Sequence, residues 1–426
     1  MIDISVLYCG FESPSTPHRY GRPIGRDVPL HQRMDVAPSA MDRRPIVVWN
    51  ITRTCNLKCV HCYSDSEATS YEGELTGDEV RRVLDDLAAF RVPAVLFSGG
   101  EPLIRPDILE LVAYARGLGL HVVLSSNGTL ITPEIARRLV ELKLAYVGIS
   151  LDSATPETHD RFRGVSGAFE RTMRGFRHCV EAGQKVGLRL TLSRPTFEDL
   201  DGVFDFIERE RINRACFYHL VPTGRGKGVL DLTRAESRLA MDMILRRTRD
   251  FHDRGLPVEI LTVDNHCDGP YMYLKMKAEG HPRADEVCEM LRWNGGGRHS
   301  SGVGIGCIDF VGDAHPDQFW MHHSLGNVRD RPFSDIWQDT SDDLMAGLKD
   351  RLPRLKGRCG LCKYQALCGG ALRVRAELMT GDPWAADPAC HLTDEEIGLT
   401  PEQVERLRAA GEHDNRADER SVLVNE

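Results

Sequence analysis

The stretch PIVVWNITRTCNLKCVHC, residues 45–62, places three cysteines directly after an apolar run. The apolar first half predicts a buried strand that leads into a cysteine loop. Cys55, Cys59 and Cys62 offer three thiolates, one fewer than the four that close a structural zinc site. An iron-sulfur cube held by three cysteines keeps one iron open, and an amino acid can chelate that iron. The alternative is a partial zinc site completed by His61 or by a distant residue.

Beyond this loop, short apolar runs alternate with segments of helical periodicity. Thr76 and Glu79 form a capping box that begins the first helix, residues 76–90. Such strand-helix units predict parallel strands covered by helices, so we expect an α/β fold, an open or closed barrel with its active site at the carboxyl ends of the strands. The six expected strands are residues 45–51, 94–97, 122–125, 146–151, 186–192 and 215–219.

The alternation predicts the domain organisation. We expect a core domain at residues 45–264, preceded by an extended N-terminal arm at 1–44. A polar, glycine-rich and irregular connecting segment, 265–306, leads to a smaller cysteine-bearing domain at 307–400. Residues 401–426 are dense in charge, and we expect a loose tail there.

Composition excludes several classes of function. The chain has 54 Lys and Arg against 63 Asp and Glu, so no broad basic surface for nucleic acid is expected. Neither a leader peptide nor an apolar stretch of about 18 residues stands out, which predicts no membrane partner and a cytoplasmic location. The 13 cysteines in a reducing compartment indicate metal binding or redox chemistry rather than disulfides.

A second cysteine set lies near the C-terminus. Cys359, Cys362 and Cys368, followed by Cys390, supply four thiolates. Four ligands can close a site, so the residues alone leave a structural zinc and an iron-sulfur cluster open.

These motifs together resemble those of the radical S-adenosylmethionine (SAM) superfamily. The spacing of the first three cysteines is its signature, and SGGEP at residues 98–102 resembles its GGEP motif. The resemblance implies a partial (β/α)6 TIM-like barrel whose first cysteine set holds a 4Fe-4S cluster. That cluster would cleave SAM reductively to a 5'-deoxyadenosyl radical. The SAM contacts implied residue by residue are His61, beside the adenine, and Gly99, Gly100, Glu101, Pro102, Ser125, Asn127, Ser150, Asp152 and Arg163. For Ser150 and Asp152, ordinary helix capping is an equal alternative.

The second cysteine set resembles the SPASM family of C-terminal extensions, which carry auxiliary iron-sulfur clusters. The resemblance implies a small C-terminal SPASM-type domain with a second 4Fe-4S cluster. Its implied ligands are Cys359, Cys362, Cys368 and Cys390. The fuller SPASM pattern has another cysteine where this chain has Leu372, so a further auxiliary cluster is not expected. Cys307 lies where the ligands of that further cluster begin, and we interpret it as a core thiol.

Residues 7–10, 19–22, 262–271 and 315–320 resemble the haem-forming group of radical SAM enzymes. This implies an iron tetrapyrrole substrate, didecarboxysirohaem, which would lose its ring A and ring B acetates to give iron-coproporphyrin III. A flavodoxin or ferredoxin is the implied electron donor. The alternatives are removal of propionates in haem d1 biosynthesis and modification of a precursor peptide by a SPASM maturase. A zinc-stabilised binding protein without enzymatic activity is the remaining alternative, and metal analysis separates it from the others.

The candidate catalytic residues are histidines and one arginine. His315, His322 and His323 are candidates, together with His266, because an imidazole can bind the iron of a tetrapyrrole or protonate a substrate acid. Arg225 is a candidate partner for a propionate, because a guanidinium fork matches carboxylate geometry. For each of these residues, a packed histidine or a surface-turn arginine is the open alternative.

Overall fold

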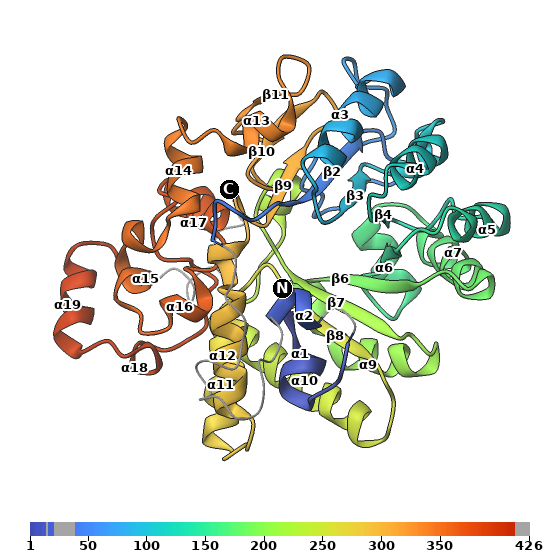
Figure 1. The fold of residues 1–426 in the computed structure, drawn as a ribbon. Helices are drawn as coiled ribbons and strands as arrows, with labels where there is room; N and C mark the ends of the chain where they lie inside the picture. The colour runs from blue at the N-terminus through green and yellow to red at the C-terminus, as the bar shows by residue number, and fades with distance from the viewer. Residues whose placement is uncertain (14–15, 21–38, 414–426) are drawn as a thin grey trace, which may run out of the picture.

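The computed structural model describes residues 1–13, 16–20 and 39–413. One 11-stranded sheet forms its centre, in the order β1-β8-β7-β6-β5-β4-β3-β2-β9-β10-β11 (Figure 1). Strands β2 to β8 pair in parallel, each with its successor in the chain, and β9 joins the other edge of β2 in parallel. The strands are β1 Ile2–Asp3, β2 Ile46–Thr52, β3 Val95–Gly99, β4 Val122–Ser126, β5 Tyr146–Ser150, β6 Val186–Leu192, β7 Arg214–His219, β8 Glu259–Val263, β9 Ile305–Ile308, β10 Asp313–His315 and β11 Gly326–Asn327.

Helices cover the outer face of the parallel strands, and a C-terminal lobe lies beside the barrel (Figure 1). The barrel helices are α3 Gly77–Ala89, α4 Ile108–Gly117, α5 Pro133–Glu141, α6 Pro156–Arg163, α7 Ala168–Ala182, α8 Arg194–Phe197, α9 Leu200–Arg209 and α10 Arg234–Asp253. The lobe contains α13 Phe333–Gln338, α14 Asp343–Lys349, α15 Gly357–Leu361, α16 Gln365–Cys368, α17 Arg373–Thr380, α18 Asp394–Ile397 and α19 Pro401–Ala409. Short 3-10 turns are η2 Pro102–Ile104, η3 Gly224–Gly228, η4 Gly296–His299 and η5 Leu352–Arg354.

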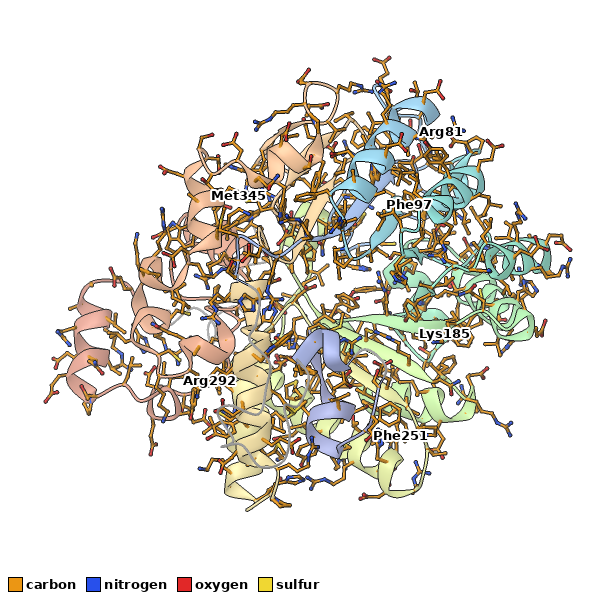
Figure 2. All side chains as sticks on the ribbon, in the orientation of Figure 1. Arg81, Phe97, Lys185, Phe251, Arg292 and Met345 are labelled. Carbon is orange, nitrogen blue, oxygen red and sulfur yellow. The ribbon has the colours of Figure 1, made fainter. Side chains whose placement is uncertain are left out.

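This architecture confirms the predicted α/β partial barrel. The expected strands correspond to β2 to β7, and the capping box of Thr76 and Glu79 begins α3 as predicted. The core lies between the strands and their helices, where Phe97 of β3 and Phe251 of α10 are fully buried, whereas Lys185 before β6 is exposed (Figure 2). Parallel strands covered by helices read as continuous apolar runs for this reason.

The described part of residues 1–44 is not the extended arm expected from the sequence. β1 pairs antiparallel with β8, and the helices α1 Ile4–Cys9 and α2 Thr16–Tyr20 follow it. Asp3 caps α1, since its Oδ1 accepts a hydrogen bond of 3.1 Å from Val6 N. Elements this short carry too few residues to show a period, and residues 21–22 of the haem-group motif lie outside the described part of the chain.

Two further segments are more regular than predicted. Residues 265–306 contain α11 Asp268–Ala278 and α12 Ala284–Asn294, which stand between the barrel and the lobe (Figure 1). The first residues of α11 are buried on all sides, so no amphipathic stripe marks the helix. The expected tail begins with α19, which Thr400 and Gln403 cap. None of the helices in the described ranges is both long and apolar enough to cross a bilayer.

Candidate active site

The first cysteine loop leaves β2 and packs directly on the end of β3. Gly100 N donates to Thr52 O at 2.8 Å, and Glu101 N donates to Thr54 O at 2.9 Å. A Cβ on Gly100 would lie only 2.2 Å from Thr54 O. Packing on the cysteine loop therefore requires glycine at this position, and the adjacent Gly99 meets Thr52 O in the same way.

The three thiols of this loop gather in one small cluster. Cys55 and Cys59 are buried and Cys62 is half-buried. Burial raises the pKa of Cys55 to about 12, so thiolates here need a cation to balance their charge. Of the residues that the structure describes, no three cysteines have sulfur atoms within 4.8 Å of one another. Tetrahedral zinc with bonds of about 2.3 Å needs sulfurs about 3.8 Å apart, so the wider iron-sulfur cube fits this loop better.

Arg163 joins the cysteine loop to β5. Its Nη1 donates to Cys59 Sγ at 3.6 Å, and its Nη2 forms an ion pair with Asp152, which is fully buried. Asp152 Oδ1 also accepts a 3.0 Å hydrogen bond from Thr191 N. Burial alone would lower the pKa of Arg163, but Asp152 and then Cys59 outweigh it and raise that pKa. A permanently positive group therefore lies against the sulfur of Cys59, an expected cluster ligand.

Glu101 is a fully buried carboxylate at the start of η2. It accepts hydrogen bonds from Asn127 N at 2.7 Å, Ser126 Oγ at 2.9 Å and Leu103 N at 3.1 Å. Burial raises the pKa of Glu101 to about 7 in spite of these donors. Asn127 continues the network, since its Nδ2 donates to Asn56 Oδ1 of the cysteine loop at 2.8 Å. The buried Pro102 continues the chain into η2.

A cavity of about 760 Å³ runs along the inside of the barrel. Of the expected SAM contacts, His61, Ser125, Ser150 and Arg163 line this cavity. The expected contacts outside its lining are Gly99, Gly100, Glu101, Pro102, Asn127 and Asp152. His61 stacks on Phe162 with ring centroids 4.4 Å apart, and its Nδ1 is buried without a hydrogen-bond partner. Burial lowers the pKa of His61 to about 4, so the ring is neutral and offers a hydrogen-bonding edge to a bound base.

The charge of this cavity is strongly one-sided. Its volume is in the range typical of small-molecule sites. The charged side chains of the described residues that line it are Arg19, Arg43, Arg44, Arg163, Arg189, Arg214 and Asp264. Carboxylates outside the lining pair with Arg19, Arg163 and Arg214, and the guanidiniums that remain favour an anionic ligand. Arg189 was not among the expected site residues, although it is a single charged residue inside the apolar strand β6, which was a signal for it.

The predicted catalytic histidines lie away from this cavity. His315 is buried, with its Nδ1 2.9 Å from His323 O. His322 Nε2 lies 3.0 Å from Glu377 Oε2, and His323 Nε2 lies 3.0 Å from Asp342 Oδ2. Among the described residues, none of these three histidines lines the cavity, whereas His266, His219 and His299 do.

Arg225 also lies away from the cavity lining. Its Nε donates to Cys59 O at 2.8 Å and its Nη2 donates to Ser66 O at 2.9 Å. The structure therefore places this guanidinium on the backbone of the cysteine loop, where it holds the loop's conformation.

The second cysteine set surrounds a small hollow in the C-terminal lobe. The residues that share this hollow are Cys267, Cys359, Cys362, Cys368 and Cys390. The backbone of η4 packs against this loop, because a Cβ on Gly297 would lie 2.2 Å from Ala371 O. Cys307 is buried in β9, where Asn50 Nδ2 lies 3.8 Å from its sulfur.

Cys267 is a fifth thiol at this hollow, and it lies outside both cysteine sets of the sequence. Its Sγ lies 3.3 Å from His391 Nδ1 and donates to Ala389 O at 3.9 Å. The neighbouring Cys267 thiol is the main reason why the pKa of Cys390 falls to about 6. Among the described residues, Cys267, Asp268 and His391 are the metal-ligating side chains whose atoms do lie within 4.8 Å of one another. The signal was absent from the sequence because more than a hundred residues separate Cys267 from Cys390.

Comparison with known proteins agrees with this site. A model of the radical SAM superfamily matches residues 49–207. Fe-coproporphyrin III synthase of Methanosarcina barkeri is 53% identical over 403 residues, which cover 93% of this chain and 99% of that protein. Pre-heme d1 synthase of Dinoroseobacter shibae is 41% identical over 385 residues, covering 89% and 94%. The crystal structure of Streptococcus suis SuiB bound to S-adenosylmethionine is similar in fold, with a TM-score of 0.64 and 19% identity over 82% of this chain and 78% of that chain.

Proposed function

This chain belongs to the radical SAM superfamily, in its haem-biosynthesis group, and from that premise we propose that it removes the ring A and ring B acetates of didecarboxysirohaem to give Fe-coproporphyrin III. It is a radical SAM enzyme, and its cofactors are SAM and 4Fe-4S clusters. The observation that carries the proposed substrate is the cavity, whose charged lining is almost entirely arginine. Tetrapyrroles of this pathway carry several carboxylates, and arginine is the side chain that best matches a carboxylate.

The first cysteine set fits the SAM-binding cluster. Cys55, Cys59 and Cys62 would hold it, and its open iron would face the cavity that His61 lines. When bound, this cluster and SAM supply reductive cleavage and the abstraction of hydrogen from the substrate. Arg163 balances the charge of the Cys59 sulfur, and Glu101 presents a buried carboxylate suited to the methionyl ammonium of SAM.

The second cysteine set fits an auxiliary cluster. Four thiols supply one ligand to each of the four irons. The proposed ligands are Cys359, Cys362, Cys368 and Cys390. A flavodoxin or ferredoxin is the proposed electron donor. The proposed location is the cytoplasm, where thiols stay reduced and available to iron.

The test is an anaerobic reaction of the iron-reconstituted protein with dithionite, SAM and didecarboxysirohaem, followed by mass analysis of the tetrapyrrole and of 5'-deoxyadenosine. Loss of two acetates is the expected result. Loss of propionates would instead assign the activity of haem d1 biosynthesis, which the 41% identity to a pre-heme d1 synthase makes the second candidate. Deoxyadenosine without any change in the tetrapyrrole would contradict both and direct the search to peptides.

A further inference from the structure

Arg189 differs from the other arginines of the barrel wall in what its guanidinium contacts. Arg163 forms an ion pair with Asp152, and Arg214 Nη1 lies 3.0 Å from Glu259 Oε2. Among the described residues, Arg189 has a hydroxyl as its hydrogen-bond acceptor and no ion pair with a carboxylate. Of the two arginines on the strands of the cavity wall, Arg189 is therefore the one without a carboxylate partner among the described residues.

The barrel nevertheless holds this guanidinium in a defined place. Nη1 donates to Ser125 Oγ at 2.7 Å, and the guanidinium carbon lies 5.6 Å from the ring centroid of Tyr218. The Nε atom is buried and has no hydrogen-bond partner. Gly148 provides the necessary space, because a Cβ there would lie 2.4 Å from Arg189 Nε. The neighbouring strands thus orient a positive group that retains an unused donor.

We propose that Arg189 binds a carboxylate of the tetrapyrrole substrate, an inference that rests on the proposed function. Arg189 is half-buried with its Nε withdrawn from solvent, and a charge partly withdrawn from water without a partner is complementary to an ion of opposite charge. The planar fork of arginine also matches a carboxylate through two parallel hydrogen bonds.

The position of Arg189 gives this contact a consequence for the reaction. Arg189 pairs in register with Ser150 at the carboxyl end of β5, and Ser150 is one of the expected SAM contacts. A carboxylate held by Arg189 therefore lies beside the SAM site. Such an anchor orients the macrocycle, and it selects the edge whose side chains face the reacting end of SAM.

The experiment measures binding by the iron-reconstituted protein under anaerobic conditions. Wild type is compared with Arg189→Gln, Arg189→Lys and the control Arg177→Gln. Arg177 is exposed on α7 and lies 3.1 Å from Glu210, so its loss leaves the cavity intact. The ligands are Fe-coproporphyrin III, Fe-etioporphyrin, which has the macrocycle without carboxylates, and SAM. Absorbance titration reports the iron porphyrins, and equilibrium dialysis reports SAM.

We expect Arg189→Gln to weaken Fe-coproporphyrin III binding about ten- to hundredfold, the effect of losing a charged hydrogen bond. Binding of Fe-etioporphyrin and SAM should stay unchanged, which also shows that the variant is folded. Arg189→Lys should recover part of the affinity, since it keeps the charge but not the fork. Arg177→Gln should behave as wild type.

Unchanged Fe-coproporphyrin III affinity in both Arg189 variants would overturn the proposal while leaving the proposed function intact. A loss confined to SAM would also overturn it, because the guanidinium would then bind the methionyl carboxylate of SAM. If wild type bound no Fe-coproporphyrin III at all, the proposed function itself would fail, and this inference with it.

Discussion

The two cysteine sets resemble each other in their backbone packing and differ in the number of their thiols. In each, a glycine from a distant segment packs on the cysteine loop, Gly100 on the first and Gly297 on the second, each with an ideal Cβ 2.2 Å from a carbonyl oxygen. The first set has three thiols and borders the large cavity, whereas the second has five thiols around a small hollow. In the proposed assignment, the number of thiols decides whether one iron of the bound cluster stays open to a ligand.

The largest expected effect comes from removing one set at a time. The triple variant Cys55→Ala, Cys59→Ala, Cys62→Ala should lose half of the iron and all 5'-deoxyadenosine formation, because the open iron is gone. The triple variant Cys359→Ala, Cys362→Ala, Cys368→Ala should also lose half of the iron but should still cleave SAM. Iron analysis and chromatography of the nucleoside measure both. If the first variant still formed 5'-deoxyadenosine, the first cysteine set could not be the one that holds the SAM-binding cluster.

Arg163, the charged residue beside the first cysteine set, gives the next largest effect. Arg163→Met leaves the buried Asp152 without its ion-pair partner, which should lower the free energy of unfolding by about 3–5 kcal/mol. Urea denaturation measures this value. The double variant Arg163→Met, Asp152→Leu should regain much of the loss, because it removes both charges. A double variant no more stable than the single one would show that the ion pair is not what Arg163 contributes.

Stability and SAM binding near the first cysteine set should also depend on pH, because burial raises the pKa of Glu101 to about 7. An unfolded glutamate ionises near pH 4.3, so the stability that Glu101 contributes is present below that pH and is lost as the pH rises through about 7. The positive methionyl ammonium of SAM binds the ionised form of Glu101 more tightly than the protonated form. SAM affinity should therefore fall up to about tenfold per unit below pH 7 and level off above it.

Equilibrium dialysis of SAM between about pH 6 and pH 8 tests this expectation. Glu101→Gln supplies the control, since an amide cannot titrate in this range and its SAM affinity should be flat with pH. An equally steep profile in that variant would assign the titration to another group.

The smallest effect is expected at the second cysteine set. Cys267→Ala should keep the full iron content, because four thiols remain around the hollow. The loss of the Cys267 thiol beside Cys390 should change only the electron paramagnetic resonance spectrum of the reduced auxiliary cluster. The triple variant without the first cysteine set is the suitable background, since it leaves one cluster to observe. A loss of iron on this substitution would make Cys267 a ligand.

The sequence predicted the parts of the molecule that local patterns encode. The parallel strands and the positions of both cysteine sets followed from apolar periodicity and from close spacing along the chain. Arg189 and Cys267 were missed because their partners are distant in sequence, at Ser125 and Cys390, and only folding brings them together. The helix α11 was missed for a related reason, since tertiary packing buries its first turn on every side.

The pairing of β9 with β2 ties the two cysteine sets to a common frame. The first loop follows β2 directly, and the second packs on η4, which leads into β9. Neither loop can shift far without breaking strand pairs, so the fold sets the distance between two bound clusters. Electron tunnelling depends steeply on distance, so a fixed separation would favour direct transfer between two bound clusters. Transfer between the clusters should therefore be indifferent to solvent viscosity, which distinguishes this molecule from redox proteins that work by domain motion.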